Sequence, residues 1–178
     1  MQMNGLAALR CWPVKVELGE GTYTIPPQPA LSWLMPIIDQ DWVGIVPGML
    51  DAADSDVDEM LDENRVSVED CIGAARDAVT TATGVPWWVA TRLAMAVVET
   101  PEIAAELLLH HVDVETVSIG GLIQTVYRLL VREADKKQRN KIDSQLQLPP
   151  VEAGPKRYDP EVAADLFEQM ARSRGLPA

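Results

Sequence analysis

The fold of this chain is decided by residues 84–98, which read GVPWWVATRLAMAVV. The stretch is apolar on nearly every side of a helix, and Arg92 is its only charged residue. A helix that is apolar all round belongs in a core or against a partner. Gly84 suits the end of a preceding helix, and Pro86 suits the first position of a new one. We therefore expect a core helix that begins at Pro86 and ends near residue 99.

The composition predicts one helical domain with a short appendage. Of the 178 residues, 47% are apolar, which is enough for one core and argues against disorder of the whole chain. Aromatic residues make up only 5%, so the core must consist mainly of Leu, Val, Ile, Ala and Met. That mixture suits helices better than a β-sandwich, and it predicts a mainly α-helical fold.

One clear β signal lies at residues 14–25, where VKVEL and TYTI flank the turn residues GEG. Alternating apolar and polar residues around a turn predict a β-hairpin. An isolated hairpin is only marginally stable, so this one must pack on helices or extend another sheet. Capping residues and apolar spacing predict further helices at 29–38, 55–63, 68–82, 100–110 and 119–132, a packed loop at 41–50, and a basic helical stretch that ends at 146–150.

The domain organisation follows from a change of composition near residue 149. We expect a helical domain with its N-terminal hairpin at residues 1–148 and a linker at 149–158. Residues 159–178 begin with Asp-Pro-Glu, a strong helix start, and predict a C-terminal amphipathic helix. Its apolar side carries Val162, Leu166, Phe167 and Met170.

The charge is strongly acidic and unevenly distributed. The chain has a net charge of −12, and residues 39–70 hold eleven acids with Arg65 as their only base. This balance disfavours binding to nucleic acid or to an anionic membrane, and it favours solubility and a partner that is basic or apolar. Because a charge inside an apolar helix needs a partner or water, Arg92 either pairs with an acid or marks the side of the helix that opens to solvent. We expect an acid partner, if there is one, to come from residues 51–70.

The compartment expected from the sequence is the cytosol. Cys11 and Cys71 form no CxxC pair, and a chain of this size needs no disulfide, so both are expected to be reduced thiols. The first residues lack the basic region of a secretory signal. No run reaches the roughly 18 uninterrupted apolar residues of a membrane span.

The sequence offers no convincing catalytic, cofactor or metal site. Residues 54–58 match the first three ligand positions of an EF-hand, but Glu59 stands where that loop needs glycine and Arg65 where it needs glutamate. His110 and His111 are neighbours on a helix, so they point about 100° apart and suit a helix C-terminus better than one metal ion. Nucleotide-binding and nucleophile motifs are also missing, which favours a protein that is not an enzyme.

Two stretches are candidates for binding a partner protein. Trp87 and Trp88 either pack in the core, each with an acceptor for its indole N–H, or place one ring outward as an interaction hot spot. The C-terminal helix, through Leu166, Phe167 and Met170, is either a docking element or a frayed tail. Both alternatives stay open from the sequence.

The order of these features resembles that of the tail assembly chaperones of siphophages that infect actinobacteria. The resemblance covers about residues 14–150. Its elements are the hairpin, the prolines that follow it, the Trp-containing helix at 30–38, Pro47-Gly48-Met49-Leu50, the acidic stretch, Ser67-Val68-Glu69-Asp70, the run from Gly84 to Leu93, and Leu148-Pro149-Pro150.

The resemblance implies a non-enzymatic protein of the host cytoplasm that keeps the long, apolar tape measure protein soluble while tail tube protein subunits polymerise around it. Such chaperones are mostly helical, form homo-oligomers and are generally absent from the finished particle, and this chain would correspond to the product without a frameshifted extension. Two other functions remain open: a structural virion component, either a head-tail connector or a minor tail protein, and a small enzyme or regulator of host origin.

Overall fold

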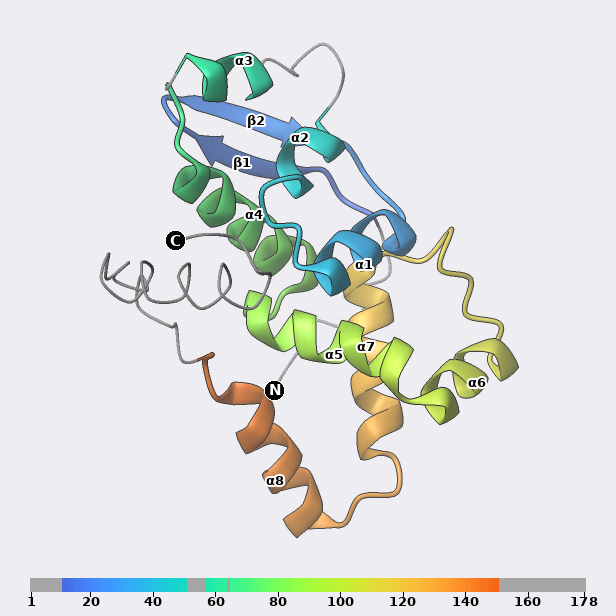
Figure 1. The fold of residues 1–178 in the computed structure, drawn as a ribbon. Helices are drawn as coiled ribbons and strands as arrows, with labels where there is room; N and C mark the ends of the chain where they lie inside the picture. The colour runs from blue at the N-terminus through green and yellow to red at the C-terminus, as the bar shows by residue number, and fades with distance from the viewer. Residues whose placement is uncertain (1–10, 51–56, 64, 151–178) are drawn as a thin grey trace, which may run out of the picture. The chain divides into compact units, whose positions relative to one another are not determined.

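A computed structural model describes residues 11–50, 57–63 and 65–150. The chain divides into two compact units, residues 1–148 and 149–178, and all of the described helices and strands belong to the first. The EF-hand-like residues 54–56 and the expected C-terminal helix lie outside the described residues. Within them, the expected mainly α-helical fold with a small N-terminal hairpin is confirmed (Figure 1).

The hairpin is formed by β1 (Val14–Leu18) and β2 (Gly21–Ile25), which pair antiparallel with Val14 opposite Ile25. Alternate residues of β1 are buried, because successive side chains of a strand point to opposite faces. The buried face packs on α4 (Val68–Thr83), so the hairpin finds the helical support that its small size requires (Figure 1).

The segment after the hairpin contains α1 (Ala30–Asp39), α2 (Ile45–Met49) and α3 (Val57–Asp62). The loop expected at 41–50 is therefore wrong in part, because it contains the single helical turn of α2. The Asp41 carboxylate accepts the Gly44 N–H at 3.0 Å and so supports the start of this turn. Pro47 is tolerated there because an N–H in the first helical turn has no intrahelical partner in any case.

Helix α4 begins and ends as the sequence predicts. The Ser67 hydroxyl accepts the Asp70 N–H at 3.1 Å, and the Asp70 carboxylate accepts the Ser67 N–H at 2.9 Å. This reciprocal capping box satisfies donors that the first helical turn leaves unpaired. Gly84 ends the helix in the left-handed conformation with a φ of 71°, which glycine adopts without strain.

The core is built around α5 (Trp87–Glu99) and α7 (Ile119–Val131), with α1 and α4 packed against them (Figure 1). Gly120 of α7 lies so close to α4 that a Cβ atom there would be 2.9 Å from the Ala82 carbonyl oxygen. Glycine at this position therefore permits the close approach of α7 to α4. The buried residues of the two central helices include Val89, Ala90, Leu93, Ala94, Leu122, Ile123 and Val126.

Two further helices complete the first unit, α6 (Pro101–Leu109) and α8 (Lys136–Gln147). Thr100 is the N-cap residue of α6, but its side chain makes no capping hydrogen bond. Cys11 and Cys71 are both free thiols, as expected. Within the described part of the chain, no helix is long and apolar enough to cross a membrane.

Candidate partner-binding surface

Helix α6 carries apolar side chains on two faces. Ile103 and Leu107 are buried against the core. Ala105, Leu108 and Leu109 are exposed and stand at helical positions i, i+3 and i+4, so they share the opposite face. Leu108 is 76% exposed and Leu109 is 71% exposed. These three residues form the α6 outer face, an apolar surface that no described residue covers.

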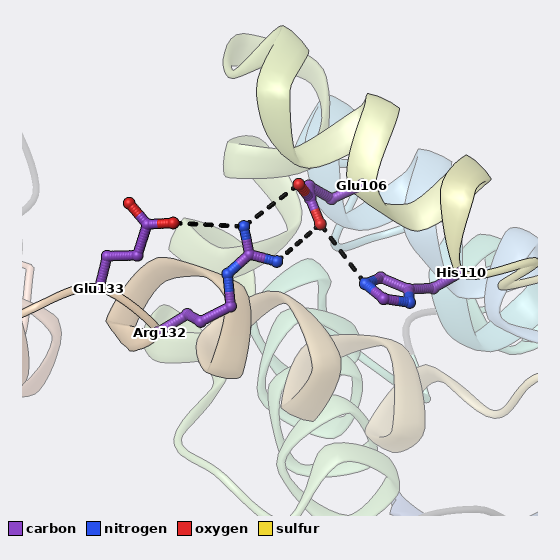
Figure 2. Close-up of polar contacts among 4 residues, drawn as sticks. All are labelled: Glu106, His110, Arg132 and Glu133. Atoms are coloured by element: carbon purple, nitrogen blue, oxygen red, sulfur yellow. Dashed lines mark hydrogen bonds and ion pairs between the residues drawn. The ribbon is translucent and has the colours of Figure 1, made fainter.

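An ion-pair cluster holds α6 against the end of α7 (Figure 2). The Arg132 guanidinium donates to both carboxylate oxygens of Glu106, at 2.7 and 3.2 Å. Glu106 also lies 3.4 Å from His110 Nε2, and Arg132 lies 3.6 Å from a Glu133 oxygen. The hydrogen bonds from Arg132 hold the pKa of Glu106 below its usual value. The cluster therefore links α6 to the end of α7 at the surface, while the buried Ile103 and Leu107 pack the helix on the core.

The C-terminal end of α6 is also fixed by backbone hydrogen bonds. His111 adopts a left-handed conformation with a φ of 53°, and its N–H donates to the Leu108 carbonyl at 3.0 Å. Residues 112–117 then reach α1, where the Leu31 N–H donates to the Val114 carbonyl at 3.0 Å. Because both ends of this connection are bonded, Leu108 and Leu109 occupy a defined place on the surface.

Trp87 and Trp88 are both half-buried and pack against the core. The Trp87 ring meets Trp42 edge-on at a centroid distance of 5.3 Å and Trp88 at 5.8 Å, while the Arg76 guanidinium lies 4.1 Å from its centroid. The buried Trp88 Nε1 finds no acceptor among the described residues, so the expectation of an acceptor for each indole is wrong for Trp88. The geometry favours core packing of both rings.

Partner binding by Trp87 and Trp88 stays a prediction. Both rings are less exposed than the side chains of Leu108 and Leu109. The other candidate binding residues belong to the expected C-terminal helix, and residues 151–178 lie outside the described part of the chain. These are Leu166, Phe167 and Met170.

Arg92 has partners of a different kind from those expected. Its Nη1 donates to the carbonyl oxygens of Gln145 at 2.7 Å, Leu146 at 3.0 Å and Leu148 at 2.7 Å, and no carboxylate of the described residues pairs with it. The last carbonyls of a helix lack intrahelical donors and carry the negative end of the helix dipole. The carbonyl oxygens at the end of α8 therefore stabilise the positive charge of Arg92, a role that was expected of an acid from residues 51–70.

A cavity of about 130 Å³ lies between α1 and α2 and is lined by Pro36, Ile45 and Met49 among others. Ligand pockets usually exceed about 300 Å³, so this one fits a single side chain better than a cofactor. Among the described residues, no three His, Cys, Asp or Glu side chains are placed to hold a metal ion.

The α6 outer face was not predicted from the sequence, although a signal for it exists. Leu107, Leu108 and Leu109 are consecutive, and successive helical residues point about 100° apart, so they cannot all face one core. Such a run on a short helix indicates that at least one leucine is either solvent-exposed or covered by a partner.

Comparison with protein-family models, curated proteins and solved structures finds no match to this chain. The candidate surface is therefore defined by its own geometry: an apolar, well-anchored helix face on a strongly acidic chain.

Proposed function

We propose that this protein is a non-enzymatic tail assembly chaperone of a siphophage, and that it binds apolar helical segments of the tape measure protein through the α6 outer face. The observation that carries the proposal is the exposure of Leu108 and Leu109, 76% and 71%, on a helix whose opposite side is buried in the core. The family resemblance supplies the identity of the partner, and the apolar face supplies a place for it to bind.

The chemistry of the α6 outer face suits such a partner. A helix that binds in the plane of a surface presents apolar residues at spacings of three and four, and Ala105, Leu108 and Leu109 offer the matching spacing. A chaperone must also keep its complex from aggregating, and a net charge of −12 favours colloidal stability through mutual repulsion. The apolar face would therefore bind the partner, and the net negative charge would keep the complex soluble.

Co-expression tests the proposal directly. The tape measure protein encoded by the same phage is expressed alone, with the wild-type chain, or with the variant Leu108→Gln/Leu109→Gln. Glutamine preserves helix propensity but removes apolar surface, so the variant is expected to fold normally and to lose its effect on tape measure solubility. The proposal fails if the wild-type chain does not raise the soluble fraction of the tape measure protein.

A matched control comes from Val68, which is 48% exposed on α4. Val68→Gln also removes an exposed apolar side chain, but it leaves the α6 outer face unchanged. We expect this variant to behave like the wild-type chain in co-expression. An equal loss of tape measure solubility with Val68→Gln would show that general surface hydrophobicity, rather than α6, is responsible.

The composition of the finished particle distinguishes a chaperone from a structural virion component. We expect mass spectrometry of purified virions to find no stoichiometric copies of this chain. A fixed copy number per particle would instead identify a head-tail connector or a minor tail protein.

Deletion of residues 151–178 tests the proposed contribution of Leu166, Phe167 and Met170. If these residues bind the partner, the shortened chain melts like the full chain but increases tape measure solubility less. A lower melting temperature would instead assign the segment to the stability of this protein.

A further inference from the structure

The α6 outer face lies in a stretch of the chain that has acidic residues but neither lysine nor arginine. Residues 93–127 contain five acids, and these are Glu99, Glu102, Glu106, Asp113 and Glu115. All of them except Glu106 are exposed. The exposed leucines of α6 therefore stand among exposed carboxylates in the sequence.

Glu102 belongs to the same side of α6 as the apolar side chains. It stands three residues before Ala105 and seven before Leu109, spacings that bring side chains to one face of a helix. Glu102 is exposed in the first turn of α6. One helical turn rises about 5 Å, so this residue lies next to the apolar surface. The N-terminal end of the α6 outer face is therefore negatively charged.

A second carboxylate is held beyond the C-terminal end of α6. Asp113 accepts the Glu115 N–H at 2.9 Å and the Thr116 hydroxyl at 3.2 Å. The connection between α6 and α7 that contains these residues is tied to α6, because the Val112 N–H donates to the Leu107 carbonyl at 2.9 Å (Figure 1). Asp113 and Glu115 remain exposed. Carboxylates therefore border the α6 outer face at both ends.

The arginine that contacts α6 already has a carboxylate partner. Arg132 donates to both oxygens of Glu106, which leaves that pair with little net charge (Figure 2). Within the described part of the chain, Glu102, Asp113 and Glu115 form no ion pair. These three carboxylates are therefore accessible to the cations of a partner.

We propose that the α6 outer face selects a basic amphipathic helix, in which Lys or Arg residues flank both ends of an apolar stripe about two turns long. The inference rests on the proposed function, in that it takes the α6 outer face as the place where a helix binds. It adds the charge that this helix must carry. Complementary charges across an interface favour encounter and fix the register, whereas like charges placed opposite each other disfavour binding.

Apolar contact alone does not give such a surface specificity. Burying a leucine side chain contributes about 1.5–3 kcal/mol whichever apolar helix covers it, so Leu108 and Leu109 do not distinguish one partner from another. Charges farther apart than about 8 Å are largely screened at physiological ionic strength. The carboxylates beside the α6 outer face, rather than distant acids of the chain, therefore decide which helices bind.

Synthetic helical peptides test the inference on the full chain. Three peptides of about 18 residues, long enough to form a helix, share one stripe of leucines and carry Lys, Gln or Glu at the flanking positions. We expect the Lys peptide to bind at least about tenfold more tightly than the Gln peptide, equivalent to about 1.4 kcal/mol, and the Glu peptide to bind most weakly. Fluorescence anisotropy of the labelled peptides measures each Kd at an ionic strength of about 0.15 M.

Two variants of equal net charge locate the carboxylates responsible. Glu102→Gln/Glu115→Gln should reduce the preference for Lys over Gln by about threefold or more, while the Kd of the Gln peptide stays unchanged. Glu17→Gln/Glu20→Gln removes two exposed acids of the hairpin and should leave the preference at its wild-type value. Asp113 is kept, because its carboxylate holds the connection after α6. Circular dichroism should show that both variants are folded, since all four substituted positions are exposed.

The inference is overturned if the three peptides bind equally or not at all, or if the hairpin variant loses as much preference as Glu102→Gln/Glu115→Gln. It is also overturned if Leu108→Gln/Leu109→Gln binds the Lys peptide as tightly as the wild-type chain, because the attraction would then lie elsewhere on this acidic chain. The peptides contain no tape measure sequence. A preference for Lys together with failed co-expression would therefore refute only the proposed function, and equal peptide affinities together with successful co-expression would refute only the basic partner.

Discussion

Arg92 and Leu148 are joined by a hydrogen bond of 2.7 Å, from guanidinium Nη1 to carbonyl oxygen, across 56 positions of the sequence. The bond connects the central core helix α5 to the last turn of the peripheral helix α8. The single charge within the most apolar stretch of the chain therefore anchors its most polar helix. The contact satisfies hydrogen-bonding groups on both helices, because the Arg92 guanidinium finds acceptors and the terminal carbonyls of α8 find a donor.

Removing this anchor should free α8 without unfolding the core. In Arg92→Ala the carbonyls of Gln145, Leu146 and Leu148 lose a charged donor, and hydrogen bonds to charged groups contribute about 1.5–3 kcal/mol. Hydrogen exchange should therefore accelerate in α8 while α7 stays protected. Arg128→Ala, which removes an exposed arginine of α7, should leave α8 protection unchanged. Equal exchange in both variants would contradict an anchoring role for Arg92.

Loss of the α4 capping box should lower global stability. Ser67→Ala removes the acceptor of the Asp70 N–H, and the expected cost is about 1 kcal/mol in the free energy of unfolding. Thr100→Ala is the comparison, because Thr100 precedes α6 without making a side-chain capping bond, and its effect should stay within about 0.5 kcal/mol. Urea denaturation measures both. Similar losses for the two variants would show that the capping box is not the cause.

The contact between α4 and α7 requires glycine at position 120. A Cβ atom in Gly120→Ala would lie 2.9 Å from the Ala82 carbonyl, so the helices must shift, at a cost of about 1–3 kcal/mol. Gly73 lies within α4 with no atom within 4 Å of a Cβ position, so Gly73→Ala should instead stabilise the protein by about 0.5–1 kcal/mol. Denaturant melts should show opposite signs. A neutral Gly120→Ala would mean that the two helices do not approach so closely.

The Glu106–Arg132 pair should make stability depend on pH in the acid range. Because the pKa of Glu106 is lowered in the folded state, the pair contributes fully above the ordinary glutamate pKa of about 4.3 and is lost as the pH falls through the lowered value. Glu106→Gln should melt below the wild-type temperature at neutral pH, and the gap should close under strongly acidic conditions.

Glu133→Gln is the control for that titration, since Glu133 is 3.6 Å from Arg132 and its side chain is 87% exposed. Its melting temperature should stay close to that of the wild-type chain throughout. A Glu106→Gln gap that persists unchanged at low pH would contradict the ion pair as its source.

Local signals in the sequence predicted much of the fold. Ser67, Gly84 and Ser118 mark helix boundaries through their own backbone chemistry, so the limits of α4 and the start of α7 could be predicted within one or two residues. The single turn of α2 was missed because Gly44, Pro47 and Gly48 individually disfavour helix. Burial of Ile45, Val46 and Met49 offsets that preference, and burial depends on tertiary contacts that sequence reasoning does not provide.

The candidate surface was less predictable than the fold. The size of Trp87 and Trp88 makes them candidates for binding a partner, but large aromatic side chains are common in protein cores as well as in interfaces. The exposure of Leu108 and Leu109 depends on which side of α6 meets the core. Ile103 and Leu107 occupy that side, where they pack on residues far away in the sequence. For the same reason, the carbonyl partners of Arg92 could not be inferred from its sequence neighbours.

The most direct test of the proposed function is calorimetric titration of the purified chain with an apolar helical segment of the tape measure protein. Burying a leucine side chain contributes about 1.5–3 kcal/mol, so Leu108→Gln/Leu109→Gln should raise the Kd by at least about tenfold. The wild-type chain and Val68→Gln should bind the segment with the same Kd. Equal affinity of the wild-type chain and the double variant would contradict binding through the α6 outer face.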